Sequence, residues 1–151
     1  MKLIKKIGLI STPIIGGSIV GFLIKHSIDY NSIIKPPLAP PSIVFPIAWS
    51  AIYLTLGISY YLIRKNEIRT NKRLKVLYYT QLIVNYLWSI IFFIFKLRLF
   101  ASAWIIILDI LVILMIKEMR HEKRISTYLN IPYLIWILFA TYLTIGIYLL
   151  N

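Results

Sequence analysis

Long uncharged apolar runs, separated by short basic segments, dominate the sequence. They are residues 7–24, 43–63, 76–95, 99–116 and 131–150, each of 18 to 21 residues. As α-helices rising 1.5 Å per residue, they would span about 27–32 Å, the thickness of the hydrocarbon core of a bilayer. Lipid cannot satisfy backbone polar groups, and the runs lack the alternation of barrel strands. The pattern therefore predicts an all-α integral membrane protein, a bundle of five transmembrane helices.

The composition fits a membrane protein and argues against nucleic-acid binding. The chain has 151 residues, of which 60% are hydrophobic, and its 17 Lys and Arg outnumber 5 Asp and Glu. The basic residues lie in short clusters between the apolar runs, as in integral membrane proteins. We therefore expect one transmembrane domain, residues 1–151, with the lipid bilayer as its environment and no nucleic-acid partner. The first run is long for a signal peptide and is interpreted as a retained helix.

Basic residues are distributed unevenly between the two sides of the predicted bundle. Three precede the first run, six lie between the second and third runs, and four lie between the fourth and fifth. The other side has two in the first connection, two in the third and none after the last run. Because cytoplasmic loops carry the excess of Lys and Arg, we expect a cytoplasmic N-terminus, with the C-terminus and the first connection outside.

The longest connection, residues 25–42, is rich in proline. Proline fixes φ and lacks a backbone donor, so residues 35–41 are expected to be stiff and extended or polyproline-like, not helical. The segment leads directly into the aromatic start of the second run at Trp49 and Tyr53. We therefore expect it to form a lid over one mouth of the bundle. The lid prolines are Pro36, Pro37, Pro40 and Pro41.

Three of the runs carry aromatic and polar residues at helical spacing, although a lipid-facing helix needs only aliphatic side chains. The stripes are Trp49, Tyr53, Gly57 and Tyr60; Gln81, Asn85 and Trp88; and Tyr133, Trp136, Ala140 and Thr144. A shared cavity lined by them would suit a flat, hydrophobic ligand with polar edges. The alternative is structural, because Trp and Tyr are enriched at membrane interfaces and polar side chains can bond neighbouring helices.

Two further features of the runs leave alternatives open. Asp109 is the one charged residue inside a run. A buried carboxylate is costly, so it is expected to face inward, as a neutral acid bonded to a neighbouring helix or as part of a proton-coupled step. Gly17 and Gly21 form a G-x-x-x-G, which permits close helix contact within the bundle or in a dimer.

Motifs of common enzymes and metal sites are not found in the sequence. It contains no cysteine, P-loop, nucleophile elbow or H-E-x-x-H. His26 and His121 fall on opposite faces of the predicted topology, so they cannot share a metal ion. We expect no metal site and no obligatory cofactor, and an enzymatic activity is not indicated.

Three segments resemble the TspO/MBR family, which comprises bacterial tryptophan-rich sensory proteins and the mitochondrial translocator protein, formerly the peripheral benzodiazepine receptor. They are KPPLAPPSIVFPIAWSAIY followed by Gly57, NYLWSIIFF in the third run, and PYLIWILFATYL in the fifth. The resemblance implies a five-helix bundle, commonly a homodimer, in what we expect to be a bacterial cytoplasmic membrane. It also implies a pocket under the first connection that binds porphyrins, haem-type tetrapyrroles or synthetic benzodiazepine-type ligands.

Carried over by position, the resemblance assigns eight residues to the pocket. They are Tyr30, Trp49, Tyr53, Asn85, Trp88, Tyr133, Trp136 and Ala140. The function it implies is a membrane receptor or sensor for a porphyrin or a related flat hydrophobic molecule. Two alternatives stay open: light-dependent porphyrin breakdown through Trp49 and Trp136, and transport of porphyrins or other lipophilic molecules.

The sequence departs from the family pattern at Asp29, Leu38 and Ile43, which stand where tryptophans are frequent. Porphyrin photodegradation is linked to tryptophans, so these departures weaken that alternative. No Lys or Arg follows Tyr142, so the sterol-recognition pattern of mammalian members is absent there. Cholesterol is therefore not predicted as a ligand.

Overall fold

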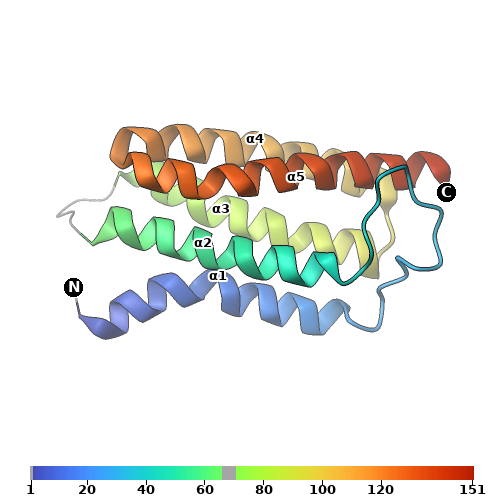
Figure 1. Cartoon of the computed structure of the whole chain (residues 1–151), viewed down its shortest axis with the longest axis horizontal. Helices are drawn as coiled ribbons and strands as arrows, with labels where there is room; N and C mark the ends of the chain where they lie inside the picture. The colour runs from blue at the N-terminus through green and yellow to red at the C-terminus, as the bar shows by residue number, and fades with distance from the viewer. Residues whose placement is uncertain (1, 66–70) are drawn as a thin grey trace.

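The computed structural model describes residues 2–65 and 71–151, which form five long helices joined by loops (Figure 1). The helices are α1 (Leu3–Ile24), α2 (Val44–Arg64), α3 (Lys72–Ser89), α4 (Arg98–Glu122) and α5 (Arg124–Leu150), and a π-helical turn, η1 (Ile90–Ile94), continues α3. All five are long and apolar enough to cross a membrane, and the described residues contain no strand. The predicted all-α bundle of five transmembrane helices is confirmed.

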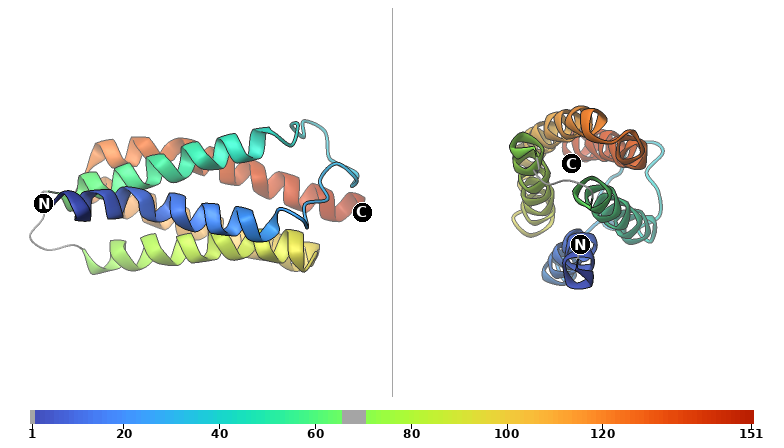
Figure 2. Two further views of the ribbon diagram at one scale, coloured as in Figure 1. Left: turned by 90° about the horizontal axis from the view of Figure 1, so that it is seen from below. Right: turned by 90° about the vertical axis from the view of Figure 1, so that its left-hand side faces the viewer.

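Seen end-on, the helices surround a shared interior (Figure 2). α1 packs on α2 and α3, α2 packs on α5, α5 packs on α4, and α4 packs on α3. The core contains aromatic side chains as well as apolar ones that are fully inaccessible to solvent, among them Leu56, Ile105, Leu108, Met115 and Ile137. Every connection between consecutive helices is short except the one between α1 and α2, so that connection is the part of the chain available to cover an end of the bundle.

α1 is the most peripheral helix, and Gly57 of α2 brings it close. Of the α1 residues, only Pro13 and Ile24 are buried. A Cβ atom at Gly57 would collide with the backbone carbonyl of Ile10. The sequence predicted that Gly57 faces a cavity, but in the structure it allows α1 and α2 to pack closely. Tyr60, from the same stripe of the second run, also lies away from the cavity.

The Tyr60 ring stacks on the Tyr78 ring, toward the end of the bundle away from the connection between α1 and α2, with centroids 3.9 Å apart and planes within 10°. Both side chains are almost completely buried. Aromatic stacking of this kind adds about 0.5–1.5 kcal/mol beyond the area that the rings bury. Tyr60 therefore belongs to the packing of α2 against α3, which is the structural alternative considered for the stripes.

α4 and α5 extend beyond the apolar runs that predicted them. The sequence predicted a connection over residues 117–130, but these residues are helical except at Lys123, where φ of −157° and ψ of 118° separate α4 from α5. Run length reports only the part of a helix inside hydrocarbon. Beyond it, Asn130 Nδ2 donates to Ser59 Oγ and Ser126 Oγ donates to Ser59 O, both at 2.8 Å. These bonds to α2 hold the extension in place.

The connection between α1 and α2, residues 25–43, crosses one end of the bundle and runs over the C-terminal end of α5 (Figure 1). The expected extended segment is interrupted by a turn, in which the Ala39 N–H donates to Pro36 O at 3.3 Å and Leu38 has a φ of 70°. Proline at the second position and a positive φ at the third are the pattern of a type II turn. The turn brings the segment back across the bundle.

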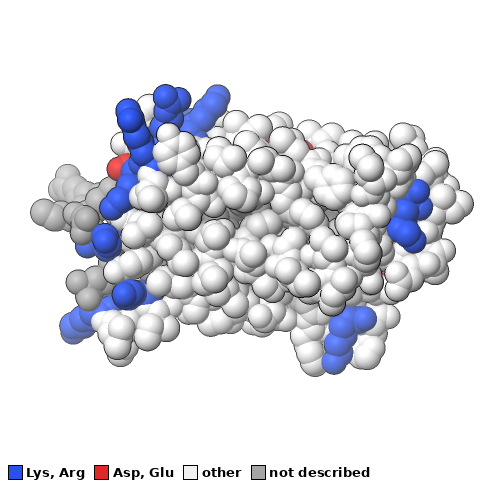
Figure 3. Space-filling view, in the orientation of Figure 1, with Lys and Arg blue, Asp and Glu red and all other residues white. Residues whose placement is uncertain are grey.

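On the face shown in Figure 3, Lys and Arg gather at the ends of the bundle and leave its long sides almost uncharged. More of them lie at the end that holds the N-terminus and the junction between α4 and α5. Uncharged sides between basic ends are typical of a chain that crosses a bilayer. Residues 66–70, including Arg69 of the second basic cluster, lie outside the described residues.

Candidate functional site

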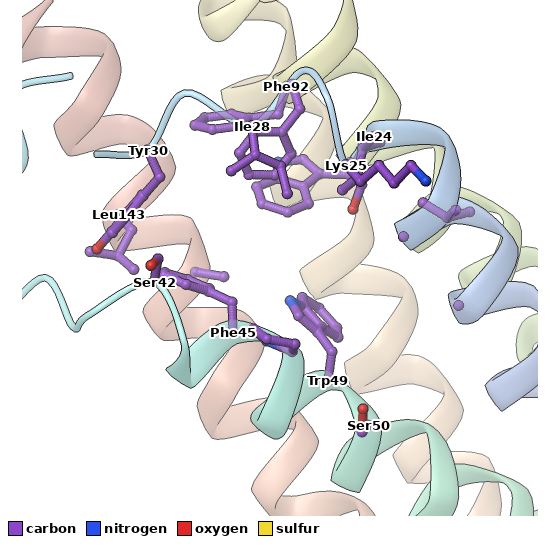
Figure 4. Close-up of a pocket in the computed structure, with 18 of the residues that line it drawn as sticks. Ile24, Lys25, Ile28, Tyr30, Ser42, Phe45, Trp49, Ser50, Phe92 and Leu143 are labelled. Carbon is purple, nitrogen blue, oxygen red and sulfur yellow. The ribbon is translucent and has the colours of Figure 1, made fainter. Parts of the chain in front are cut away.

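A cavity of about 730 Å³ lies beneath the connection between α1 and α2. Its walls come from α1, α2, the end of α3 with η1, and the C-terminal half of α5. In Figure 4, Tyr30 and Ile28 of the connection, Trp49 of α2, Phe92 of η1 and Leu143 of α5 surround this space. The volume falls within the range of about 300–1,000 Å³ that is usual for small-molecule sites.

Five of the eight residues assigned to the pocket line this cavity, and three lie behind its wall. The lining residues are Tyr30, Trp49, Tyr53, Trp88 and Ala140, and the others are Asn85, Tyr133 and Trp136. Each stripe is divided by depth along its helix. Its part nearer the connection reaches the cavity, whereas its deeper part is occupied by hydrogen bonds and ring packing.

A buried chain of hydrogen bonds occupies the deeper part. Tyr53 Oη donates to Asn85 Oδ1 at 2.7 Å, and Asn85 Nδ2 donates to Tyr133 Oη at 2.8 Å. Tyr133 Oη in turn donates to Gln81 Oε1 at 2.7 Å. Four polar side chains from α2, α3 and α5 are thus linked at a depth where water is scarce, and only Gln81 Nε2 among the atoms of this chain has no partner in the described residues. Since Tyr53 lines the cavity, the chain fixes the position of one wall residue.

Aromatic rings form two layers on the α2 side of the cavity. The Trp49 ring stacks on Tyr53, with centroids 5.6 Å apart and planes at 24°. Behind it, Trp136 meets Trp49 edge-on at 6.2 Å and 86°, and it meets Phe45 at 5.7 Å. Each ring is held by others at separations typical of favourable aromatic pairs. The rings of this wall therefore support one another without a ligand between them.

Tyr30 is the roof residue and is only 4% exposed. Its hydroxyl donates to Pro40 O at 2.6 Å, and its ring packs edge-on against Phe45 at 4.9 Å. The Lys35 ammonium bonds Tyr30 O at 3.0 Å and lies 5.0 Å from the Tyr30 ring centroid. Burial raises the pKa of the Tyr30 hydroxyl, so the group stays a neutral donor at physiological pH.

None of the four lid prolines lines the cavity in the described structure. Pro36 is buried where a Cβ atom at Gly146 of α5 would touch its ring. Pro37 O accepts a hydrogen bond from Tyr142 Oη at 2.7 Å. Here the prolines brace the connection against α5, and the non-proline residues beside them form the roof.

The π-helical turn η1 shapes the wall contributed by α3. Its wider hydrogen-bond pattern includes the Phe95 N–H, which donates to Ile90 O at 3.2 Å. Phe92 and Phe93 are adjacent in sequence, yet both line the cavity. Such turns often mark functional sites in helices. The π-helical turn could not be predicted from the sequence, because IIFFI is equally compatible with a regular α-helix.

An ion pair ties the roof to the turn between η1 and α4. Arg98 Nη2 donates to both carboxylate oxygens of Asp29, at 2.9 and 2.7 Å. Lys96 Nζ lies 3.6 Å from the same carboxylate. The Arg98 side chain is 13% exposed, and its guanidinium lies 4.2 Å from the centroid of the Phe92 ring. The pair therefore joins the connection to a cavity wall residue.

Sequence reasoning missed the contribution of α1, which lines the cavity with Gly17, Ser18 and Gly21 among others. A Cβ atom at Gly17 would run into the Tyr53 ring, whereas one at Gly21 would meet nothing within 4 Å. Of the two contacts considered for the G-x-x-x-G, the one within the bundle is present at Gly17. Small residues spaced by four were the available signal for this wall.

Most of the cavity surface is apolar, and two of its polar groups bear directly on which ligands fit. Trp88 lines the cavity, and its buried Nε1 has no hydrogen-bond partner in the described part of the chain. Lys25 is the charged residue among the lining residues, and its ammonium lies 4.1 Å from the centroid of the Phe22 ring at the rim. The described residues contain no group of three side chains suited to a metal ion. The site thus suits a flat apolar molecule with acceptor or anionic groups at its edge.

Asp109 faces α5 and lies outside the cavity lining. Its Oδ2 is 2.7 Å from Thr141 Oγ1, which is also 2.9 Å from Ile137 O. A hydroxyl carries one hydrogen, so Thr141 can donate to only one of these oxygens. The shorter contact is the one in which Thr141 Oγ1 donates to Asp109 Oδ2, so Asp109 faces inward and is bonded to the neighbouring helix α5.

Comparison with known proteins identifies the family. Residues 9–150 match the model of the TspO/MBR family. The chain is 38% identical to the "Tryptophan-rich protein TspO" of Archaeoglobus fulgidus, over 100% of this chain and 99% of that protein. It is 31% identical to the "Translocator protein homolog" of Schizosaccharomyces pombe, over 92% and 87%. It is 29% identical to the "Tryptophan-rich sensory protein" of Cereibacter sphaeroides, over 80% and 75%. The chain is an integral membrane protein and belongs to the TspO/MBR family.

Proposed function

We propose that this protein is a membrane receptor or sensor that binds a porphyrin, or a related flat hydrophobic molecule, in the cavity beneath the connection between α1 and α2. The observation that carries the proposal is the aromatic wall of Trp49 and Tyr53, which is held in place before binding by Trp136 and by the Asn85 hydrogen bonds. Such preorganisation lowers the entropy lost when a ligand binds. The names of relatives, which include a sensory protein and a translocator protein homolog, support the same kind of role.

The polar groups of the cavity favour a tetrapyrrole with carboxylate side chains. The apolar macrocycle would lie against Trp49 and Phe92, and a carboxylate at its edge would attract the ammonium of Lys25 at the rim. The free Trp88 N–H offers a donor deeper in the cavity. No protein ligand to a central metal ion is needed for this mode of binding.

Quenching of tryptophan fluorescence by protoporphyrin IX or haem, in detergent or nanodiscs, tests the proposal. The wild-type protein should show saturable quenching, and Trp49→Ala should weaken the affinity about tenfold or more, because it removes the stacked wall ring. Trp136→Ala should have a smaller effect, because Trp136 supports Trp49 from behind. The matched control is Trp104→Phe, which removes a tryptophan whose Nε1 bonds Val84 O at 2.9 Å and which is not among the lining residues.

Light-dependent porphyrin breakdown is the second candidate, and one contact favours it. The ring centroids of Trp49, in the wall, and Trp136 are 6.2 Å apart, a distance over which an oxidised indole can be reduced by electron transfer from its neighbour. This activity would change the porphyrin spectrum under illumination in oxygen beyond a control without protein. A pure binder would leave the spectrum equal to that control.

Orientation and assembly complete the proposal. We infer a cytoplasmic N-terminus and an outward-facing connection between α1 and α2 from the excess of basic residues at the other end of the bundle. A single cysteine introduced at Asn31 should then react with a membrane-impermeant reagent added from outside. Labelling from the cytoplasmic side alone would contradict this orientation.

We further propose a homodimer, which crosslinking in membranes at native expression levels would test.

A further inference from the structure

A second cavity, of about 390 Å³, lies at the junction between α4 and α5, and its lining is different in character. It is lined by Arg120 of α4 and by Arg124, Thr127 and Tyr128 of α5. The junction is at the end of the bundle opposite the connection that covers the first cavity (Figure 1). Lys and Arg cluster around this end in the space-filling view (Figure 3).

The two arginines of this cavity are not neutralised by the protein. Within the described part of the chain, neither guanidinium lies within 4.0 Å of a carboxylate. The nearby Glu118 is engaged by α3, at 3.2 Å from Arg73 Nε and 3.1 Å from Asn71 Nδ2. Glu122 pairs with neither arginine by the same criterion. Two cations therefore face one cavity without an internal counterion.

The polar groups beside the arginines can also bind an anion. Thr127 Oγ1 is buried and has no hydrogen-bond partner among residues 2–65 and 71–151. The first turn of α5 contains no acidic residue, and its N-cap residue, Lys123, makes no side-chain capping bond. The negative end of the α4 dipole lies one residue away and opposes the positive end of the α5 dipole, so the arginines supply the positive charge of this cavity. The hydroxyl of Thr127 is therefore a hydrogen-bonding group that an anion in the cavity could satisfy.

The depth of this cavity matches the phosphate layer of a bilayer. The fourth apolar run ends at Ile116, so Arg120 lies about 6 Å farther along the helix at 1.5 Å per residue. The headgroup region adds about 5–8 Å to each side of the hydrocarbon core. Tyr128, which is 70% exposed, lies three residues before the fifth run, a usual place for an interfacial tyrosine.

We propose that Arg120, Arg124 and Thr127 form a binding site for a phosphate ester group, supplied by an anionic phospholipid of the leaflet on this side. The planar guanidinium matches phosphate oxygens with paired hydrogen bonds, and it is less strongly hydrated than an ammonium. The lipid source follows from the depth of the site and from the bilayer beside it. A soluble phosphate ester has the same headgroup chemistry, so the test must distinguish the two sources.

Native mass spectrometry of the purified full-length protein can count retained lipids. With equimolar phosphatidylglycerol and phosphatidylcholine, we expect wild-type protein to retain phosphatidylglycerol preferentially. Arg120→Gln with Arg124→Gln should reduce that retention about tenfold. The matched control is Lys72→Gln with Lys75→Gln, which removes two exposed basic residues from α3 at the same end and should change little. Arg120→Lys with Arg124→Lys preserves the charge and should retain an intermediate amount.

Several results decide the proposal. If Arg120→Gln with Arg124→Gln and the control Lys72→Gln with Lys75→Gln lose phosphatidylglycerol equally, the lipid is attracted to the basic surface in general. If Arg120→Gln with Arg124→Gln retains as much as wild type, no site exists at these arginines. Either result overturns the proposal. Glycerol phosphate, added at millimolar concentration, separates the sources. Retention of lipid in its presence supports the phospholipid, whereas displacement supports the same phosphate chemistry with a soluble source. Thermal unfolding of each variant confirms that it is folded.

Discussion

The Tyr53 hydroxyl donates a hydrogen bond of 2.7 Å to the Asn85 side-chain oxygen, and this bond connects the wall of the cavity to the buried core. Tyr53 supports Trp49 by stacking, and Asn85 is held from its other side by Tyr133. The three helices α2, α3 and α5 are thereby fixed relative to one another at the base of the cavity. The geometry of the wall and the stability of the bundle depend on the same contact.

Tyr53→Phe should therefore lower stability and ligand affinity together. The substitution removes the donor and leaves Asn85 Oδ1 without it, and hydrogen bonds between helices in membranes are worth about 0.6–2 kcal/mol. We expect a fall of several degrees in the unfolding midpoint in detergent, with a loss of porphyrin affinity of a few fold. Tyr148→Phe, at a partly exposed position, is the control and should behave as wild type. Wild-type stability in Tyr53→Phe would show that the hydrogen bond does not form in the membrane.

Gly57 should tolerate no side chain, because α1 crosses α2 there. A Cβ atom would meet the Ile10 carbonyl, which is backbone and cannot swing aside. Gly57→Ala is expected to destabilise the protein by about 1–3 kcal/mol, as overpacking does in other cores. Gly8→Ala is the matched control, since a Cβ atom there meets nothing within 4 Å. Thermal unfolding of the pair measures the difference, and equal midpoints would contradict the close approach of α1.

The ion pair between Asp29 and Arg98 should control the mobility of the roof. Arg98→Gln removes the bidentate bond and leaves Asp29 with the longer contact to Lys96 at 3.6 Å. We expect faster amide hydrogen exchange over residues 25–43 and faster release of ligand. Lys96→Gln should do little, because the Lys96 side chain is 54% exposed and pairs of exposed charges contribute at most about 1 kcal/mol. Identical exchange in wild type and Arg98→Gln would rule out this tie.

Lys25 should discriminate between porphyrins by the charge at their edge. Protoporphyrin IX carries two carboxylates, and its dimethyl ester carries none. Lys25→Gln should weaken binding of the acid by about two- to fivefold, as expected for an exposed ion pair, and should leave binding of the ester unchanged. Lys72→Gln is the control, because that exposed residue begins α3 at the other end of the bundle and does not line the cavity. An equal loss for acid and ester would show that Lys25 does not recognise the carboxylate.

The fold was predictable from the sequence because the physical constraint is simple. A run of apolar residues as long as the bilayer is thick has to be a helix, and the five runs leave no other arrangement. The helix ends were less predictable. Residues 117–130 remain helical because Ser126 and Asn130 bond Ser59 of α2, and a count of apolar residues does not register that contact.

The cavity was predictable only in part, since a stripe of polar and aromatic residues does not reveal which of its members reach an open space. Asn85 and Tyr133 have the same helical spacing as Trp88 and Ala140. The first two are hydrogen-bonded to each other behind the cavity wall and do not line the cavity. The wall from α1 was missed, because the spacing of Gly17 and Gly21 indicates close helix contact but not a cavity, and the residues around them are those of a lipid-facing helix. The regular appearance of IIFFI likewise concealed the π-helical turn.

Determination of the structure with protoporphyrin IX bound tests the central proposal most directly. The account predicts density for the macrocycle inside the cavity, against Trp49 and Phe92 and beneath Tyr30, with a carboxylate near Lys25. It also predicts that the Tyr53 to Asn85 hydrogen bond is retained on binding. Porphyrin density on the outer, lipid-facing surface of the helices, with the cavity unchanged, would contradict it.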